Sequence, residues 1–495
     1  MLLAVFKTVV GLKNPRWVRL PYFSAILNKK GISMNNIKNK MSKIPAIDTF
    51  INTENGIKLV NEFGAGMTKF VLRKALDKIR NKIKTDENST IPNVAEIAEI
   101  VKEKLMRFSS PEGRDAINAT GIMLHTGLGR APYANNATDS LSVFNGYSVL
   151  QTDLKTGKRS LREEKIEEML CELTGCEAVT ILNNNAEGTM LILNEIAKDK
   201  EVIISRGQLV EIGGSFRMPD VMDQSGAIMK EIGTTNKTHI KDYRNAVSAN
   251  TGALLHVHTS NYRVRGFASM PDVKDICEFR KNEFPDLPVI DDIGSGGLVH
   301  LSEFGLPNEP LIKESIAAGA DLVCFSGDKL ISGAQAGIIC GKRKYIDKIR
   351  KNSFARMFRV GKMTLAVLET TLIHFINKTY KEEIPFYKML SRDLEALEKD
   401  VQSLEKALKE KAEYNISIID DTAYIGSGSA PDQGIPDKVL KIEPTNIKPA
   451  ELAKKLRLNT PSIFCRIKNG SLLFNMRTLL NDDLGNLKQG LIKVL

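Results

Sequence analysis

The chain has 495 residues, a formal net charge of +11, 42% hydrophobic residues and six cysteines. Such a length predicts a large buried core divided over two or three domains. No apolar run approaches the length that spans a bilayer, so we expect no membrane partner. The cysteines show neither metal-ligand spacing nor the density of a disulfide-rich protein, which favours a reducing cytoplasmic location and no metal.

The first 43 residues are basic and contain no acidic residue. Lys7 interrupts the apolar opening, and no small-residue cleavage site follows it, so a secretory signal fits poorly. We expect a basic tail without fixed structure over 1–43. A transit-like segment is the alternative, and Met34 and Met41 are candidate start residues.

Residues 44–110 are predicted to form a small helical domain, because apolar side chains recur at helical spacing from Met67 to Ile83. A second helix is predicted over Val94 to Phe108. A solvated basic face and a phosphate-binding surface are both possible explanations for the cations of the first helix. These cations are Lys69, Arg73, Lys74, Lys78, Arg80, Lys82 and Lys84.

Strand-like and helix-like stretches alternate over 111–378, which is typical of a doubly wound, mostly parallel α/β sheet. Pockets in such folds lie beyond the carboxyl ends of the strands. The predicted strand Ala178 to Leu182 ends at an asparagine turn containing Asn184, Asn185 and Ala186. A helix follows over Thr189 to Ala197, and its free backbone N–H groups predict a phosphate site at this turn.

Two further strand ends carry charged residues, namely Asp291 with Asp292 and then Lys329. A partly desolvated lysine can lose its proton and attack a carbonyl, as in the linkage to pyridoxal phosphate (PLP). In aminotransferase-like PLP enzymes an aspartate pairs with the pyridinium nitrogen, and the lysine follows roughly thirty to forty residues later. Asp291 and Lys329 fit this order, and Asp292 is the alternative partner of the nitrogen.

Three other positions are candidates for the same pocket. Gln208 follows a predicted strand where a planar side chain usually covers the cofactor ring. Ser326 stands three residues before the lysine, the usual position of a hydroxyl that reaches the phosphate. Arg356 and Arg359 are expected to share one helical face that could clamp an oxyanion, although such a spacing is common on surfaces.

Beyond Thr379, helices rich in charged residues are predicted, and strands and a hairpin over Ser462 to Met476 follow them. This pattern indicates a small C-terminal α+β domain at 379–495.

Several segments resemble the bacterial L-seryl-tRNA(Sec) selenium transferase family, the selenocysteine synthases. The resemblance extends from about Ile44 to the C-terminus, and many separate motifs occur in one order. The segments that carry it are Ile117 to Gly121, His125 to Pro132, Ser205 to Arg217, Gly233 to Thr238, His258 to Tyr262, Asp291 to Gly296 and Ser326 to Lys329.

The resemblance implies an aminotransferase-like fold (PLP fold type I) with a tRNA-binding domain at 44–110 and a PLP-binding domain at 111–378. It implies conversion of seryl-tRNA(Sec) to selenocysteinyl-tRNA(Sec), in which water leaves the serine β carbon and selenium from selenophosphate adds there. Lys329 would bind PLP and shuttle protons. A homo-oligomeric ring is also implied.

The resemblance further implies that Arg130, Arg356 and Arg359 bind the selenophosphate-type anion. It implicates Asp328 in catalysis, whereas the residues alone leave open a simple turn-forming role.

Some residues depart from the family pattern. Gly127, Ser332 and Ala334 stand where Asn, Gly and Pro are expected, and Lys158 to Arg162 lacks the usual arginine-glycine run. An alternative is therefore a PLP-dependent lyase that acts on a small amino or sugar acid. The helical N-terminal domain argues against this alternative, because a lyase with a small substrate has no use for it. A second alternative is a tRNA-binding protein without catalysis, against which Lys329 and Asp291 argue.

Overall fold

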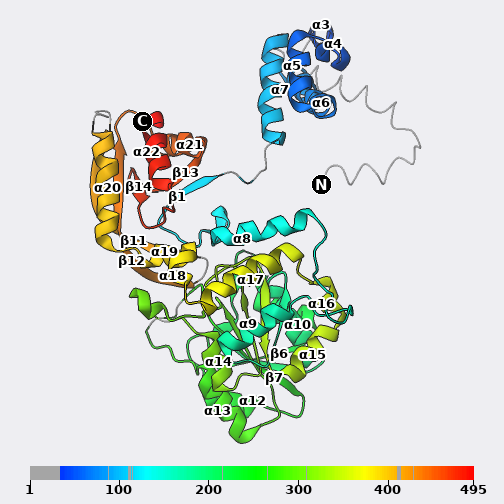
Figure 1. Cartoon of the computed structure of the whole chain (residues 1–495), viewed down its shortest axis with the longest axis vertical. Helices are drawn as coiled ribbons and strands as arrows, with labels where there is room; N and C mark the ends of the chain where they lie inside the picture. The colour runs from blue at the N-terminus through cyan, green and yellow to red at the C-terminus, as the bar shows by residue number, and fades with distance from the viewer. Residues whose placement is uncertain are drawn as a thin grey trace, which may run out of the picture. The chain divides into compact units, whose positions relative to one another are not determined.

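The computed structural model describes residues 34–86, 89–109, 113, 115–214, 216–262, 264, 266–307, 309–409, 414–426 and 429–495. The chain forms two compact units, Met1–Arg114 and Asp115–Leu495 (Figure 1). Residues 1–33 of the expected tail lie outside the described residues. No helix in the described part of the chain is long and apolar enough to cross a membrane.

The first unit is a bundle of helices around its own core. Residues 34–42 are helical, and Ile37 is buried in that core, so the expectation of an unstructured tail is wrong for this stretch. The helix predicted from Val94 is confirmed. The helices are α3 (Met34–Ser42), α4 (Ile47–Ile51), α5 (Glu54–Phe63), α6 (Ala65–Thr85) and α7 (Val94–Ser109).

Helix α6 is amphipathic, as its apolar spacing predicts. It buries Val71 and Leu76 in the core, while Lys74, Lys78 and Lys82 are exposed at four-residue intervals along one face. The helix therefore presents a row of cations to solvent.

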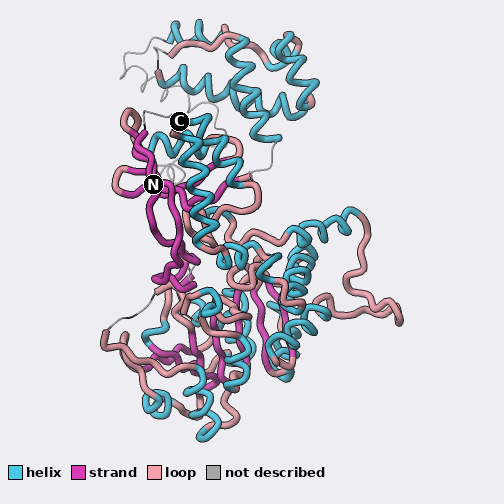
Figure 2. The backbone as a smooth tube through the Cα atoms, turned by 60° about the vertical axis from the view of Figure 1, so that its left-hand side comes forward, coloured by secondary structure: helices cyan, strands magenta, loops and turns pink. Residues whose placement is uncertain are grey.

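The second unit contains a seven-stranded sheet of order β2-β10-β9-β8-β7-β3-β6, in which β10 alone among these strands runs antiparallel to its neighbours. Figure 2 shows strands of this unit with helices beside them. This arrangement confirms the doubly wound, mostly parallel sheet. The strands are β2 (Ala178–Leu182), β3 (Glu201–Ser205), β6 (Ile228–Ile232), β7 (Thr251–Val257), β8 (Val289–Gly294), β9 (Leu322–Ser326) and β10 (Gly337–Gly341).

Helices cover both faces of this sheet, each with a separate core. One face packs against α9 (Glu164–Thr174), α12 (Ile240–Ala246), α13 (Val273–Glu283), α14 (Ile312–Ala318) and α17 (Lys362–Ile376). The other face packs against α10 (Asn185–Ala197), α11 (Met218–Ser225) and α15 (Arg343–Lys351). Because side chains alternate along a strand, Asp291 and Asp292 of β8 point to opposite faces.

A second sheet has the order β1-β13-β14-β12-β11 and forms the small α+β part of the unit. Its apolar face packs against α20 (Leu394–Leu408), α21 (Pro449–Arg457) and α22 (Asp483–Val494). The predicted hairpin is confirmed, with Asn469 and Gly470 at positive φ in its turn. The strands are β1 (Ala116–Ala119), β11 (Tyr414–Gly426), β12 (Ser429–Pro444), β13 (Ser462–Lys468) and β14 (Ser471–Asn475).

Strand β1 corrects the expected boundary at residue 111. Residues 116–119 pair in parallel with β13, from Ala116 with Ser462 to Ala119 with Cys465. The segment before the large sheet is therefore a strand of the C-terminal sheet, where Ile117 joins its core. A short strand without a local hairpin partner gives no sequence signal for such a distant pairing.

Candidate active site

Polar residues of three strands lie toward one edge of the large sheet. The asparagine turn follows β2 and Lys329 follows β9, whereas Asp291 is the third residue of β8 and lies within that strand. This edge is where doubly wound sheets bind ligands.

The asparagine turn is the N-terminus of α10. The Asn184 side chain caps the helix by accepting a hydrogen bond from the Glu187 backbone N–H at 3.1 Å, so the helix begins at Asn185 rather than at Thr189. Gly337 is required opposite, because a Cβ there would lie 1.9 Å from the Asn184 carbonyl oxygen. The buried Oδ1 of Asn185 has no hydrogen-bond partner in the structure. Asn184, Asn185 and Ala186 thus form a fixed turn at the start of α10, directly after β2.

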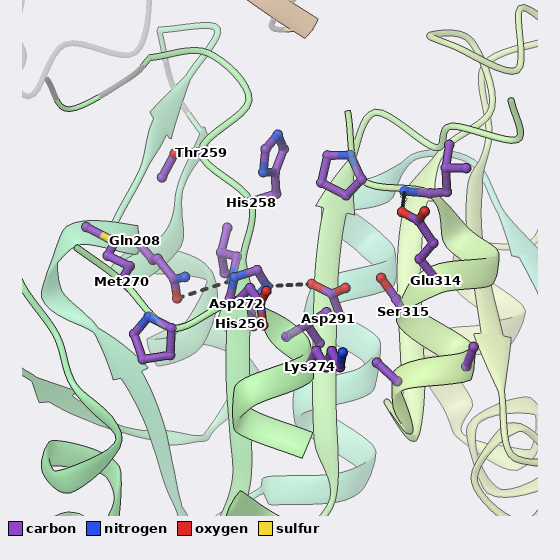
Figure 3. Close-up of a pocket in the computed structure, with 17 residues that line it drawn as sticks. Gln208, His256, His258, Thr259, Met270, Asp272, Lys274, Asp291, Glu314 and Ser315 are labelled. Atoms are coloured by element: carbon purple, nitrogen blue, oxygen red, sulfur yellow. Dashed lines mark hydrogen bonds and ion pairs between the residues drawn. The ribbon is translucent and has the colours of Figure 1, made fainter. Parts of the chain in front are cut away.

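Asp291 is fully buried, and His256 on β7 lies directly opposite it in the sheet. The Nδ1 atom of His256 is 2.7 Å from Asp291 Oδ1 (Figure 3). The other carboxylate oxygen, Oδ2, is buried and has no hydrogen-bond partner among the described residues. An unsatisfied buried carboxylate oxygen is costly, so this atom is suited to bind a donor supplied by a ligand.

Asp292 differs because its carboxylate is saturated by protein donors. Oδ1 accepts hydrogen bonds from Asn185 Nδ2 at 2.8 Å and from the Gly294 N–H at 3.1 Å, and Oδ2 accepts one from Thr189 Oγ1 at 2.8 Å. Burial raises the pKa of Asp292, and the bonds from Asn185 and Thr189 oppose that rise. Asp292 therefore ties β8 to the first turns of α10.

Lys329 follows β9 and is only 7% exposed. Burial lowers the pKa of its amine, and the charge of Arg130 lowers it further. The carboxylates of Asp292, Asp328 and Glu309 act in the opposite direction. A lysine with a lowered pKa supplies more of the neutral amine that reacts with a carbonyl.

The side chain of Asp328 forms an ion pair with Arg130, so its role is not limited to forming the turn. Arg130 Nη1 donates to Asp328 Oδ2 at 2.9 Å, and Oδ1 of Asp328 is buried with no partner in the part of the chain that the structure describes. Arg130 has a φ of 64°, an uncommon conformation for a side-chain-bearing residue, which marks the loop that carries it as tightly constrained. The structure thus places Arg130, Asp328 and Lys329 together.

Gln208 and Asp291 line one cavity of about 700 Å³, together with His256, His258 and Met270 (Figure 3). Gln208 is 3% exposed, and its Oε1 accepts a hydrogen bond from the Val257 N–H at 3.3 Å. Ser326 is buried at the end of β9. Gln208 lines this cavity, whereas Ser326 does not.

The expected common helical face of Arg356 and Arg359 is wrong. Helix α16 (Ser353–Met357) ends before Arg359, which instead forms an antiparallel bridge with Leu182. The Asn183 N–H also donates to the Phe358 carbonyl at 3.1 Å. The backbone of this segment pairs with the end of β2 and therefore leaves the helix. Arg359 lies beside the asparagine turn, whereas Arg356 is exposed on α16.

Sequence reasoning missed three groups at this edge. His256 and His258 alternate at the end of β7, and each faces a buried carboxylate; His258 Nε2 lies 3.0 Å from Glu309 Oε2. Arg162 donates to the Val360 carbonyl and to Gln151. Burial, and then the charges of Arg359 and Arg159, lower its pKa. The only available signal was the alternation of the two histidines.

Ser332, which replaces an expected glycine, has a φ of 60°. Its Oγ donates to the Lys329 carbonyl at 3.0 Å. The left-handed conformation explains why glycine suits this position, and the hydrogen bond compensates for its absence. This departure from the family pattern therefore leaves the lysine turn intact.

The chain matches the family model described as L-seryl-tRNA selenium transferase over residues 116–480. It is 40% identical over 455 residues to the L-seryl-tRNA(Sec) selenium transferase of Carboxydothermus hydrogenoformans, covering 92% of this chain and 97% of that protein. Identity to the protein of that name from Aquifex aeolicus is 45% over 399 residues, which is 80% of this chain and 88% of that protein.

Among solved structures, D-glucosaminate-6-phosphate ammonia-lyase is similar in fold, with a TM-score of 0.54 and 17% identity. The match covers 82% of this chain and 98% of that chain. This likeness supports the aminotransferase-like architecture and carries no inference about the substrate. The matches along the sequence do identify the family: the chain belongs to the L-seryl-tRNA selenium transferases.

Proposed function

We propose that this protein converts seryl-tRNA(Sec) to selenocysteinyl-tRNA(Sec) with PLP bound at Lys329. The observation that carries the proposal is the buried lysine with a lowered pKa, beside Asp328 and Arg130, in a chain 40% identical to a transferase of this name over almost its whole length. The alternatives of a small-molecule lyase and a non-catalytic tRNA-binding protein become outcomes of the tests.

The residues at the sheet edge fit PLP. The partnerless Oδ2 of Asp291 is suited to accept a hydrogen bond from a pyridinium N–H, whereas both oxygens of Asp292 already accept hydrogen bonds. The first turn of α10, with Asn184, Asn185 and Ala186, suits the phosphate, and Ser326 would add a hydroxyl. Gln208 would cover the ring. Bound PLP would supply an aldehyde for the serine amine and an electron-accepting ring.

Lys329 is the group that would move protons at the serine. Its neutral amine, favoured by burial, can accept the proton of the α carbon. The protonated Lys329 can then give this proton to the β-hydroxyl, which leaves as water. Asp328 holds Arg130 in place, and its partnerless Oδ1 can accept a hydrogen bond from that hydroxyl. Asp291 would keep the ring nitrogen protonated throughout, since burial excludes water from its carboxylate.

Selenophosphate requires concentrated positive charge, and Arg130, Arg356 and Arg359 are the proposed source. Arg130 stands beside Lys329, and Arg359 stands beside the asparagine turn. Arg162 supports this arrangement, because the charge of Arg359 is close enough to lower its pKa. An anion bound among these guanidinium groups would relieve their mutual repulsion.

The tRNA would bind the basic face of α6 in the first unit. Lys74, Lys78 and Lys82 are spaced along this helix, and Phe70 and Phe108 lie exposed beside them with ring centroids 5.7 Å apart. Cations track phosphates, and exposed aromatic rings can contact bases. This combination suits a nucleic acid better than a solvated helix surface.

A homo-oligomer is proposed from the segment that follows α8 (Asn135–Asp139). Val143, Tyr147, Val149 and Leu154 are 56%, 110%, 62% and 81% exposed, which is unusual for apolar side chains so close in sequence. A second copy of the chain is the proposed partner, and a ring is the assembly that the family resemblance implies.

The direct test incubates the PLP-loaded protein with seryl-tRNA(Sec) and selenophosphate and identifies the amino acid released by deacylation. We expect selenocysteine from the wild type and only serine from Lys329→Ala. Selenocysteine production by the lysine variant would contradict the assignment of Lys329. Unchanged serine with the wild type, together with ammonia release from a small amino acid, would favour the lyase.

A further inference from the structure

Three cysteine thiols gather at the end of β2 that is remote from the candidate active site. Cys171 lies in α9, Cys176 lies just before β2, and Cys340 lies on β10, where it pairs with Val179 of β2. The Sγ atoms of Cys171 and Cys176 are 3.6 Å apart. The five residues of β2 separate this cluster from the asparagine turn.

The local backbone brings the two closest thiols together. Helix α9 ends at Gly175, whose φ of 77° lets the chain reverse, and the Gly175 N–H donates to the Cys171 carbonyl at 2.8 Å. Thr174 Oγ1 bonds to the Leu170 carbonyl and accepts from the Cys176 N–H at 3.4 Å. The close approach of the sulfur atoms is thus built into the helix end.

The environments of the two thiols differ in a way that favours oxidation. A hydrogen bond from Cys340 lowers the pKa of Cys176 to about 6, whereas burial raises the pKa of Cys171. Cys171 is partly exposed and Cys176 is nearly buried. A thiolate reacts with oxidants far faster than a thiol, and a neighbouring second thiol then captures the product.

We infer that Cys171 and Cys176 are a modification site, a thiol pair that a hydroperoxide converts into a reversible disulfide. The sulfur atoms need to approach by roughly 1.5 Å to reach the length of a disulfide bond. Rotation of the two side chains is the motion required. The inference does not depend on the proposed function.

The two steps balance without another reactant. The Cys176 thiolate attacks one oxygen of the hydroperoxide, so an S–O bond forms and the O–O bond breaks; the remaining alkoxide or hydroxide takes a proton. The Cys171 sulfur then attacks the Cys176 sulfur, forming the S–S bond and releasing hydroxide, which leaves as water with the Cys171 proton. Two thiols are oxidised and one hydroperoxide is reduced.

The test treats the full-length protein with a small excess of hydrogen peroxide and analyses its tryptic peptides. Cys171 and Cys176 occur in the same peptide, Ile166 to Lys198, which contains no other cysteine. We expect this peptide to lose two hydrogens and to regain them with dithiothreitol. Cys465, which is partly exposed, is the internal control for non-specific oxidation and should react roughly ten-fold more slowly.

Two variants distinguish the thiol that reacts with peroxide from the thiol that forms the disulfide with it. In Cys171→Ser the sulfenic acid at Cys176 should persist and be trapped by dimedone, and in Cys176→Ser the peptide should keep its mass. Circular dichroism verifies that each variant is folded. The inference is overturned if both thiols of the wild type react no faster than Cys465, or if the peptide gains oxygen without forming a disulfide.

Discussion

His256 Nδ1 lies 2.7 Å from Asp291 Oδ1, inside the sheet and next to the carboxylate oxygen that has no partner. The two residues face each other across β7 and β8. A hydrogen bond to one oxygen fixes the carboxylate plane, which leaves the other oxygen aimed and available. His256 is therefore expected to position Asp291 for the cofactor nitrogen.

Replacing His256 by leucine should weaken PLP binding by about ten- to a hundred-fold, because a hydrogen bond to a buried charge contributes roughly 1.5–3 kcal/mol. Asparagine should restore much of the affinity, since its amide nitrogen can replace Nδ1. Equilibrium dialysis against PLP measures both variants. Equal affinities of the leucine variant and the wild type would contradict the positioning role.

Asp291→Asn and Asp292→Asn should fail in different ways. Asp291→Asn should fold normally and lose the protonated-ring absorption of bound PLP. Asp292→Asn should lower the free energy of unfolding by roughly 2–4 kcal/mol, since an amide cannot accept all the bonds from Asn185, Thr189 and Gly294. Urea unfolding and absorption spectra separate the two effects. The reverse pattern would assign the ring nitrogen to Asp292.

The sequence indicated the candidate residues because the elements that carry them are local. Strand β2 has the predicted bounds, the asparagine turn and the lysine each follow a strand, and Asp291 lies within β8. Sequence reasoning could not find the His256–Asp291 and Arg130–Asp328 pairs, since these join segments 35 and 198 residues apart. Side-chain pairing across a sheet is set by register, which no local pattern encodes.

The charge of Arg130 should set the pH at which Lys329 reacts. Burial lowers the pKa of Lys329 first and Arg130 adds to this, so Arg130→Gln should raise it. The rate at which apoprotein combines with PLP should then reach its midpoint at a higher pH than in the wild type. Arg130→Lys keeps the charge and is the matched control. Asp328→Asn should move the midpoint downward, because Asp328 raises this pKa.

An unchanged midpoint in Arg130→Gln would show that the guanidinium does not act on the lysine.

Neutralising the basic face of α6 should weaken tRNA binding in a salt-dependent way. The double variant Lys78→Gln with Lys82→Gln should reduce the slope of log affinity against log salt by roughly two, about one for each lost phosphate contact. Lys399→Gln with Lys406→Gln, on exposed positions of α20, is the matched control. Filter binding at several salt concentrations measures the slopes. Equal slopes for both double variants would remove α6 from the binding surface.

The errors of the sequence reasoning have specific physical causes. Asn184 was not recognised as a helix cap, so α10 was predicted to start too late. Arg359 was placed on a helix because its spacing from Arg356 is helical, but the bridge to Leu182 overrides that local preference. Ile37 was assigned to a tail because the basic residues around it hide one buried side chain. A local helix cap decided the first case, and tertiary contacts decided the other two.

The central claim is that Lys329 holds PLP and that the serine esterified to selenocysteine tRNA is the substrate. The most direct test records the absorption of PLP on the purified protein before and after adding seryl-tRNA(Sec), with serine on an ordinary serine tRNA as control. We predict a band shift only with seryl-tRNA(Sec), and no lysine-linked band in Lys329→Ala. A yellow protein whose spectrum is indifferent to both tRNAs would contradict the account.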